Sequence, residues 1–197
     1  SNLVTGGERG LLGLALDPDF ANNHFLYAYY TSSGPLRNKI IRLTDSSSAG
    51  TNETVIVDNL PASGPNHNGG VIQFGPDGKL YVVIGDVENT NNSQNTSSLA
   101  GKILRYNKDG TIPSGNPFDN TPVWAYGIRN SFGFTFHPHT GDLWETENGP
   151  DQDDEVNRIV PGGNYGWPNV TGIANNSQYI DPIVEITPTI APTGIVA

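Results

Sequence analysis

The sequence has no cysteine and no methionine among its 197 residues. Without cysteine the chain cannot form disulfide bonds, thiolate metal sites or a thiol nucleophile. A translated chain normally begins with methionine, and Ser1-Asn2-Leu3 opens without the basic stretch and apolar core of a signal peptide. We therefore expect a processed protein or part of a longer chain. No apolar run approaches the roughly 18 residues that a membrane-spanning helix needs.

Charged residues are also scarce, at 15% of the chain, and most are negative: 20 acidic against 10 basic residues, a net charge of −10. This surplus argues against nucleic acid or an anionic membrane surface as a partner. Hydrophobic residues make up 35%, whereas 24 glycines and 15 prolines indicate many turns, which argues against a helical bundle or coiled coil. Short apolar clusters recur throughout, so the chain is expected to fold.

Five Asn-x-Ser/Thr triplets are present, at Asn52, Asn91, Asn95, Asn169 and Asn175. Their density is typical of an exported, glycosylated surface and predicts an extracellular or periplasmic location. The alternative is chance, because a chain rich in asparagine, serine and threonine produces such triplets without glycosylation.

A repeating unit runs along the chain. An alternating apolar strand, a proline-centred turn and a second strand recur three times, with the turns at Pro18, Pro76 and Pro138. Each unit predicts a β-hairpin, and a third strand follows it. Three to four strands in about 60 residues are typical of a β-propeller blade.

We therefore predict an all-β, β-propeller fold over residues 1–197, with blades at about 6–60, 61–120 and 121–180. A β-sandwich is the alternative, although a sandwich does not require internal similarity. Propellers close with four or more blades, so three blades predict that the remaining ones are absent from this chain.

Loops at one end of a propeller converge on its axis, so equivalent loops of successive blades can meet. His67 lies between glycines and amides just before a predicted strand, and imidazole suits a general base. The alternative is a surface histidine bonded to a local carbonyl. Arg129, in the equivalent loop of the next blade, could stabilise an oxyanion or hold a carboxylate, or form an inter-blade salt bridge.

The acidic run Asp151–Glu155 offers hard oxygen ligands suited to calcium, and the carbonyls of Gly149 and Pro150 could supplement them. The run lacks the spacing of an EF-hand, and a solvated acidic turn is the alternative. His24, His137 and His139 are expected to be surface residues.

Several of these segments resemble one family. Residues 6–20, GGERGLLGLALDPDF, resemble the first-blade motif of the soluble glucose/sorbosone dehydrogenases, which include pyrroloquinoline-quinone-dependent aldose sugar dehydrogenases. Further segments resemble later motifs of that family, in family order: Asn66–Gly70, Tyr126–Asn130, Glu147–Pro150, Asp153–Asn157 and Gly162–Pro168. The resemblance extends over roughly residues 3–170.

The resemblance implies a six-bladed propeller that binds the quinone across its axis, with a calcium ion beside it. His67 would take the proton of the sugar's anomeric hydroxyl while a hydride passes to the quinone, which yields a lactone. Arg129 and Asn130 would contact the quinone. The carbonyls of Gly149 and Pro150 would bind calcium. Three further positions match a segment that binds calcium in some members: Asp154, Glu155 and the carbonyl of Tyr165.

Two positions depart from the glucose-oxidising members. Glu8 replaces a glutamine that faces the sugar, and Asn66 replaces an aspartate beside the base, which leaves the orientation of His67 open. The family's remaining cofactor-binding lysine and arginines come from blades beyond residue 197. The alternative function is a non-catalytic propeller that serves as a binding or structural module of an exported glycoprotein. With either function the chain could form a homo-oligomer or a larger assembly. A lactonase-like calcium hydrolase matches the motifs less well.

Overall fold

The protein is described here by a computed structural model of residues 2–197, and its regular elements are almost all β-strands. The first four-stranded sheet contains β1 (Leu11–Leu16), β2 (Phe25–Ser32), β3 (Arg37–Ser46) and β4 (Ala49–Leu60). The second contains β5 (Ile72–Phe74), β6 (Leu80–Ile84), β7 (Lys102–Tyr106) and β8 (Val123–Tyr126). The third contains β9 (Ser131–Phe136), β10 (Leu143–Glu147), β11 (Asp154–Ile159) and β12 (Val184–Ile186).

Two helices of four residues, α1 (Phe20–Asn23) and α2 (Asn91–Gln94), complete the elements. Over residues 2–197 neither helix has the length or apolar character needed to cross a membrane.

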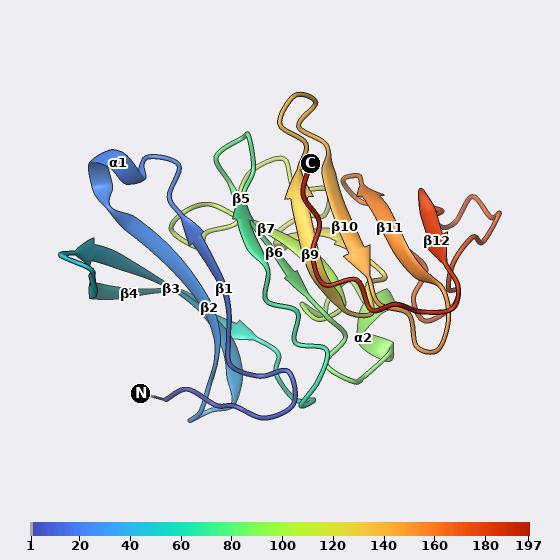
Figure 1. The fold of residues 1–197 in the computed structure, drawn as a ribbon, viewed down its shortest axis with the longest axis horizontal. Coiled ribbons are helices and arrows are strands. Elements are labelled where there is room, and N and C mark those ends of the chain that lie inside the picture. Colours follow the sequence, from blue (N-terminus) through green and yellow to red (C-terminus); the bar gives the residue numbers. More distant parts are fainter. Residues whose placement is uncertain (1) are drawn as a thin grey trace.

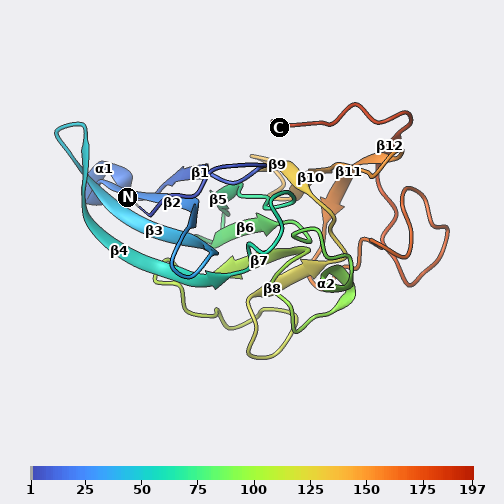
Figure 2. The same ribbon diagram turned by 90° about the horizontal axis from the view of Figure 1, so that it is seen from below.

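Each sheet follows chain order, and every pair of neighbouring strands is antiparallel. The three sheets lie side by side (Figures 1 and 2), and their first strands, β1, β5 and β9, border one common cavity. This arrangement confirms the predicted all-β propeller fold, of which the chain forms three blades, rather than the two packed layers of a sandwich.

The predicted hairpins are present, because each turn proline lies just beyond the end of β1, β5 or β9. The blade limits differ from the prediction. The sheets extend from 11 to 60, from 72 to 126 and from 131 to 186, so β8 and β12 lie past the expected limits at 120 and 180. These last strands have four and three residues, too few for an alternating pattern to show in the sequence.

The second sheet is buried on both faces. Along β6, Leu80, Val82 and Ile84 pack in the core toward the first sheet, whereas Tyr81 and Val83 pack in the core toward the third. Alternate side chains of one strand thus hold both neighbouring blades, and each fully buried side chain of this size contributes about 1.5–3 kcal/mol. The loops at the strand ends are consequently fixed relative to one another.

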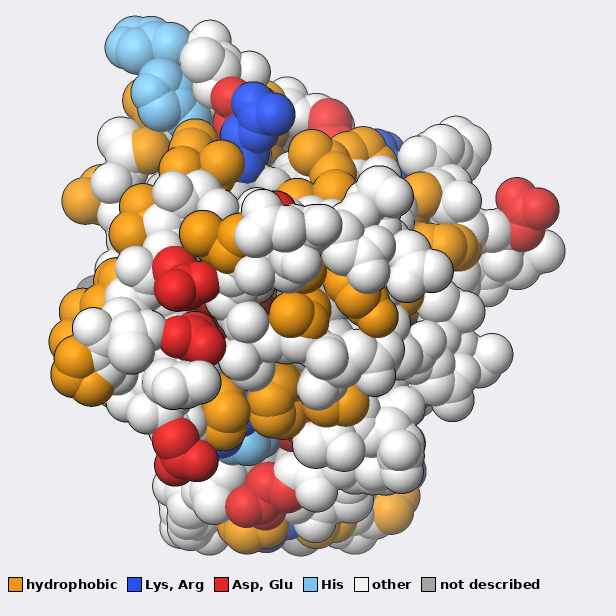
Figure 3. All heavy atoms as spheres, turned by 90° about the vertical axis from the view of Figure 1, so that its right-hand side faces the viewer, with side chains coloured by type: hydrophobic (Ala, Val, Ile, Leu, Met, Phe, Trp, Pro, Cys, Tyr) orange, Lys and Arg blue, Asp and Glu red, His pale blue; other side chains and the backbone are white. Residues whose placement is uncertain are grey.

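The surface reflects the composition. Figure 3 views the side on which β11 and β12 lie, where uncharged side chains and backbone cover most of the face, acidic side chains are scattered and basic ones are few. This agrees with the net charge of −10.

Candidate functional site

Three loops of the second and third blades meet at one end of the sheets: the segment before β5, the turn after β6 and the segment before β9. The backbone N–H of Asp86 donates to the carbonyl of Arg129 at 2.8 Å, and that of Val87 donates to the carbonyl of His67 at 3.2 Å. Gly85 lies close to the two accepting carbonyls, since a Cβ on it would lie 2.5 Å from the His67 oxygen and 2.7 Å from the Arg129 oxygen. Only glycine allows the three loops to approach this closely.

His67 is held by a carboxylate that the sequence analysis missed. Its Nδ1 lies 2.7 Å from Oδ1 of Asp86, whose side chain is 1% exposed, while the histidine side chain is 16% exposed. The same Oδ1 accepts the backbone N–H of Glu88 at 2.8 Å. Because the carboxylate accepts from Nδ1, the neutral imidazole carries its proton there, and Nε2 can accept one.

Asn66 does not orient the imidazole. Its side-chain nitrogen donates to Oε1 of Glu88 at 2.9 Å instead. The orientation that the departure at Asn66 left open is therefore supplied by Asp86, which follows the apolar strand β6 as Gly85-Asp86. A polar residue directly after a buried strand was the available signal, but only the fold brings it to His67.

The backbone around this pair is strained. His67, Val87 and Glu88 have φ values of 58°, 52° and 59°, in the left-handed region. Each such residue costs roughly 1–3 kcal/mol, and strain of this kind clusters at functional sites. Valine is the least suited of the three because it is β-branched.

Glu8 joins the loops of all three blades. One of its carboxylate oxygens, Oε2, accepts the backbone N–H of His67 at 2.6 Å and the side-chain N–H of Asn130 at 3.0 Å. The half-buried Glu8 thus touches both predicted site loops.

Arg129 and Asn130 provide a cation and a free acceptor. The Arg129 guanidinium donates to the carbonyl of Asn148 at 2.9 Å and lies 5.4 Å from the ring centre of Trp167. Throughout residues 2–197 it forms no ion pair, so the alternative of an inter-blade salt bridge is wrong. Asn130 is 2% exposed, and its Oδ1 has no hydrogen-bond partner. The Arg129 guanidinium fits a planar anionic quinone, to whose oxygens its remaining N–H groups can donate, whereas the Oδ1 of Asn130 has almost no exposed surface.

Asp154, a predicted calcium ligand, binds three backbone N–H groups. Its Oδ1 accepts the N–H of Gly149 at 2.8 Å, and its Oδ2 accepts the N–H groups of Ile190 and Ala191 at 2.6 and 2.8 Å. The carboxylate is fully buried, and its three backbone donors compete with any metal ion.

Glu155, another predicted ligand, also has partners within the fold. The oxygens of Glu155 accept the N–H of Gly172 at 2.7 Å and the side-chain N–H of Asn157 at 3.0 Å. Tyr165 is buried, with its hydroxyl on the carbonyl of Arg158. Within the described part of the chain, no three His, Asp or Glu side chains are arranged to hold a metal ion. The carbonyls of Gly149 and Pro150 accept no backbone hydrogen bond from residues 2–197.

Three glutamates, Glu145, Glu147 and Glu155, are buried on one face of β10 and β11. Burial is the main reason that the pKa of Glu145 is raised to about 8 and that of Glu155 to about 7. Burial and then repulsion by Glu145 raise the pKa of Glu147 well above its usual range, and its Oε1 accepts the N–H of Arg129. The sequence does not reveal this cluster, because alternation alone does not show which face of a strand is buried.

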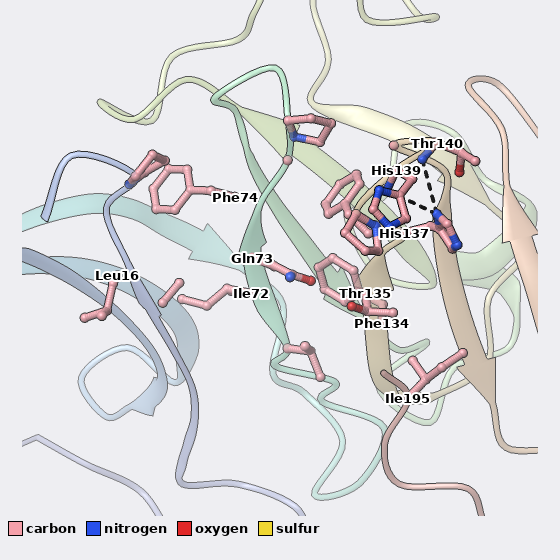
Figure 4. Close-up of a pocket in the computed structure, with 18 of the residues that line it drawn as sticks. Leu16, Ile72, Gln73, Phe74, Phe134, Thr135, His137, His139, Thr140 and Ile195 are labelled. Carbon is pink, nitrogen blue, oxygen red and sulfur yellow. Dashed lines mark hydrogen bonds between the residues drawn. The ribbon is translucent and has the colours of Figure 1, made fainter. Parts of the chain in front are cut away.

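A cavity bordered by all three sheets lies elsewhere. It has a volume of about 920 Å³ and is bordered by β1, β5, β9 and the turns after β5 and β9, and none of the predicted site residues lines it. Gln73 and Thr135 lie along this cavity (Figure 4), and the His137 ring accepts the N–H groups of His139 and Thr140. His24 and His139 are exposed and His137 is half-buried, and within residues 2–197 none of the three hydrogen-bonds to His67.

The chain is similar to known dehydrogenases. The family model described as glucose / sorbosone dehydrogenase matches residues 1–197. Quinoprotein glucose dehydrogenase B of Acinetobacter calcoaceticus is 38% identical over 205 residues, which cover 88% of this chain and 42% of that protein.

Two solved structures share the fold. An oxidoreductase of Thermus thermophilus, described as a glucose dehydrogenase, has a TM-score of 0.90 and 44% identity over 95% of this chain and 59% of that one. The quinone-bound aldose sugar dehydrogenase of Streptomyces coelicolor has a TM-score of 0.87 and 40% identity over 94% of this chain and 56% of that one. The chain spans about half the length of the curated relatives it matches, 42%, 54% and 50% of three of them.

Proposed function

Because the chain belongs to the glucose/sorbosone dehydrogenase family, we propose that it supplies the base and a cation of a sugar-oxidising site. The proposed reaction is oxidation of an aldose at its anomeric hydroxyl to the lactone, with pyrroloquinoline quinone as the cofactor. The relatives support the cofactor and the substrate class, since one is a quinoprotein glucose dehydrogenase and another is a quinone-bound aldose sugar dehydrogenase. The observation that carries the proposal is the His67–Asp86 pair beside the loop of Arg129 and Asn130.

His67 is the proposed base. Asp86 fixes Nδ1, which leaves Nε2 to take the proton of the anomeric hydroxyl. As the anomeric C–H and O–H bonds break, the carbon–oxygen double bond of the lactone forms, and the hydride leaves with the C–H electron pair. When bound, the quinone supplies the two-electron acceptor for that hydride. The buried carboxylate of Asp86 stabilises the imidazolium that His67 becomes.

Arg129 and Asn130 are the proposed cofactor contacts. The Arg129 N–H groups that make no internal bond can donate to quinone or carboxylate oxygens. Asn130 is proposed as a contact from its place beside Arg129; its side-chain nitrogen is held by Glu8, and its Oδ1 is unpartnered and enclosed. Glu8, which binds the N–H of His67, and Asn66, which precedes His67 on the same loop, are the proposed sugar contacts.

The carbonyls of Gly149 and Pro150 are proposed to hold a calcium ion, since carbonyl oxygens are among the ligands that this ion prefers. The fit is limited to these two oxygens, because the carboxylate of Asp154 already accepts three backbone N–H groups. Glu155 and the carbonyl of Tyr165 are retained as a second candidate site. The expected result is quinone binding that requires calcium and is lost on chelation.

Replacement of His67 tests the proposed base. In the full chain with quinone and calcium, His67→Ala is expected to lower turnover of an aldose, measured with an artificial electron acceptor, by at least about 100-fold. Quinone affinity should change by no more than a few-fold. The matched control is His139→Ala, at an exposed histidine remote from the site.

Turnover by His67→Ala at the parental rate would refute the assignment. A parent chain that binds no quinone in the presence of calcium would favour the non-catalytic binding or structural module instead.

We also propose that the protein is exported and glycosylated. The asparagines of all five Asn-x-Ser/Thr triplets are exposed. One triplet is hindered, since Ser93, the hydroxyl residue of the Asn91 triplet, is fully buried and donates to the carbonyl of Ile128. A mass decrease on deglycosylation of the native protein, with Asn91 unmodified, is the expected result.

A further inference from the structure

One side chain, Trp167, touches both halves of the proposed site. Its indole Nε1–H donates to Oδ2 of Asp86 at 2.9 Å, and its ring lies under the Arg129 guanidinium at 5.4 Å. Trp167 lies in the long connection between β11 and β12 of the third blade, whereas Asp86 follows β6 of the second. The base and the cation are thus linked through a residue that neither of their own loops supplies.

The indole bond completes the contacts of a buried carboxylate. Oδ1 of Asp86 accepts Nδ1 of His67 at 2.7 Å and the N–H of Glu88 at 2.8 Å, and Oδ2 accepts from Trp167. Asp86 is 1% exposed, so an Oδ2 without the indole donor would have no solvent to replace it. Because the indole holds one oxygen, it fixes the plane of the carboxylate and therefore the direction in which the other oxygen faces His67.

Hydrogen bonds from the second blade hold the backbone of Trp167 and the nearby Asn164. Gln94 and Asn164 exchange two amide bonds, both of 2.9 Å, and Gln94 also donates to the carbonyl of Trp167 at 2.8 Å. The Trp167 N–H donates to the carbonyl of Gly127 at 3.1 Å. These bonds cross from the second blade to the third, so the place of the ring does not depend on its own loop alone.

We propose that Trp167 is a positioning residue of this site: its indole N–H orients Asp86, and through it His67, while its ring face supports Arg129. The catalytic consequence depends on the proposed function. The placement of the His67–Asp86 pair does not.

The placement is tested without any turnover. In the ¹⁵N-labelled full chain, the Nδ1 proton of His67 is bonded to Asp86 and should exchange slowly with water. Trp167→Phe keeps a ring under Arg129 but removes the N–H donor. Exchange of the Nδ1 proton should then become about tenfold faster or more, because one hydrogen bond to a charged group is lost. The matched control, Trp144→Phe on β10, removes an indole that donates no hydrogen bond to residues 2–197 and should leave exchange unchanged.

Kinetics with quinone and calcium then separate the two roles. Trp167→Phe should lower kcat about tenfold with the KM of the aldose and the quinone affinity nearly unchanged. Trp167→Leu should lower kcat equally and also weaken quinone binding about two- to fivefold, because the ring under Arg129 is lost. Gln94→Ala removes a bond that holds the Trp167 backbone and leaves the indole intact. It should therefore weaken the indole–Asp86 bond less and give a smaller increase in the exchange rate of the Nδ1 proton.

Exchange of the His67 proton that is as slow in Trp167→Phe as in the parent would overturn the proposal. So would a kcat loss in Trp167→Leu that Trp167→Phe does not share. If the parent oxidises no aldose, the proposed function fails, and the exchange measurement still decides the role of Trp167.

Discussion

Replacement of Glu8 provides the sharpest test of how the loops are joined. Its Oε2 accepts two donors, the backbone N–H of His67 at 2.6 Å and the side-chain N–H of Asn130 at 3.0 Å. A hydrogen bond to a charged group contributes about 1.5–3 kcal/mol, and the half-exposed position of Glu8 favours the lower value. Glu8→Ala should therefore lower the free energy of unfolding by about 3 kcal/mol.

Glu8→Gln is the matched variant. An amide oxygen can accept the same two bonds, but without the charge, so the expected loss is only about 1 kcal/mol. If Glu8 also contacts the sugar, Glu8→Gln should change the ratio of KM values for two aldoses while kcat stays within a few-fold.

Urea unfolding followed by tryptophan fluorescence measures the stability change, since the midpoint shifts at constant slope when only stability differs. Amide exchange at His67 locates it, because the N–H that Glu8 accepts should exchange faster in Glu8→Ala than in Glu8→Gln. Equal stability of Glu8→Ala and the parent, within about 0.5 kcal/mol, would refute the bridging role.

Three further predictions concern stability. Gly127→Ala should lower the free energy of unfolding, measured by thermal unfolding, by about 2 kcal/mol or more, because φ is +81° and the new Cβ would lie 2.5 Å from Oδ1 of Asn164. Gly115→Ala is the control and should lower it less, because Gly115 has a similar φ of +84° but open space around it. Burial lowers the pKa of Lys102 to about 7, so the unfolded chain binds more protons between pH 7 and 10. Urea unfolding should show stability rising across this range by up to about 1.4 kcal/mol per pH unit, a slope that Lys102→Met removes. Asp154→Asn should lower stability by about 2 kcal/mol and expose the C-terminal residues to proteases first.

The propeller could be predicted from the sequence because its signals are local. Period-two alternation and a proline just after the first strand of each blade both lie within about 20 residues. The short strands β8 and β12 were missed, because their pairing with β7 and β11 is decided by partners and not by their own pattern.

The site could be predicted only in part, for a related reason. His67 and Arg129 could be predicted from their residue types and neighbours. The carboxylate of Asp86, which orients His67, lies 19 positions away in the sequence, and the indole of Trp167, which binds that carboxylate, lies a further 81 positions away. The structural contacts of Asp154 could not be predicted either. Its place in an acidic run suggested a metal ligand, yet its partners include backbone N–H groups 36 and 37 positions away.

The strained backbone at the site is maintained by hydrogen bonds, one of them from another blade. His67, Val87 and Glu88 occupy left-handed backbone conformations that an isolated loop would leave. Each is held from outside its own turn or by its neighbour: Glu8 binds the N–H of His67, the carbonyl of His67 binds the N–H of Val87, and Asp86 binds the N–H of Glu88. The second sheet, buried on both faces, keeps these partners at fixed distances. A loosened contact between blades would therefore allow the turn after β6 to relax, and His67 would lose its carboxylate before the blades themselves unfold.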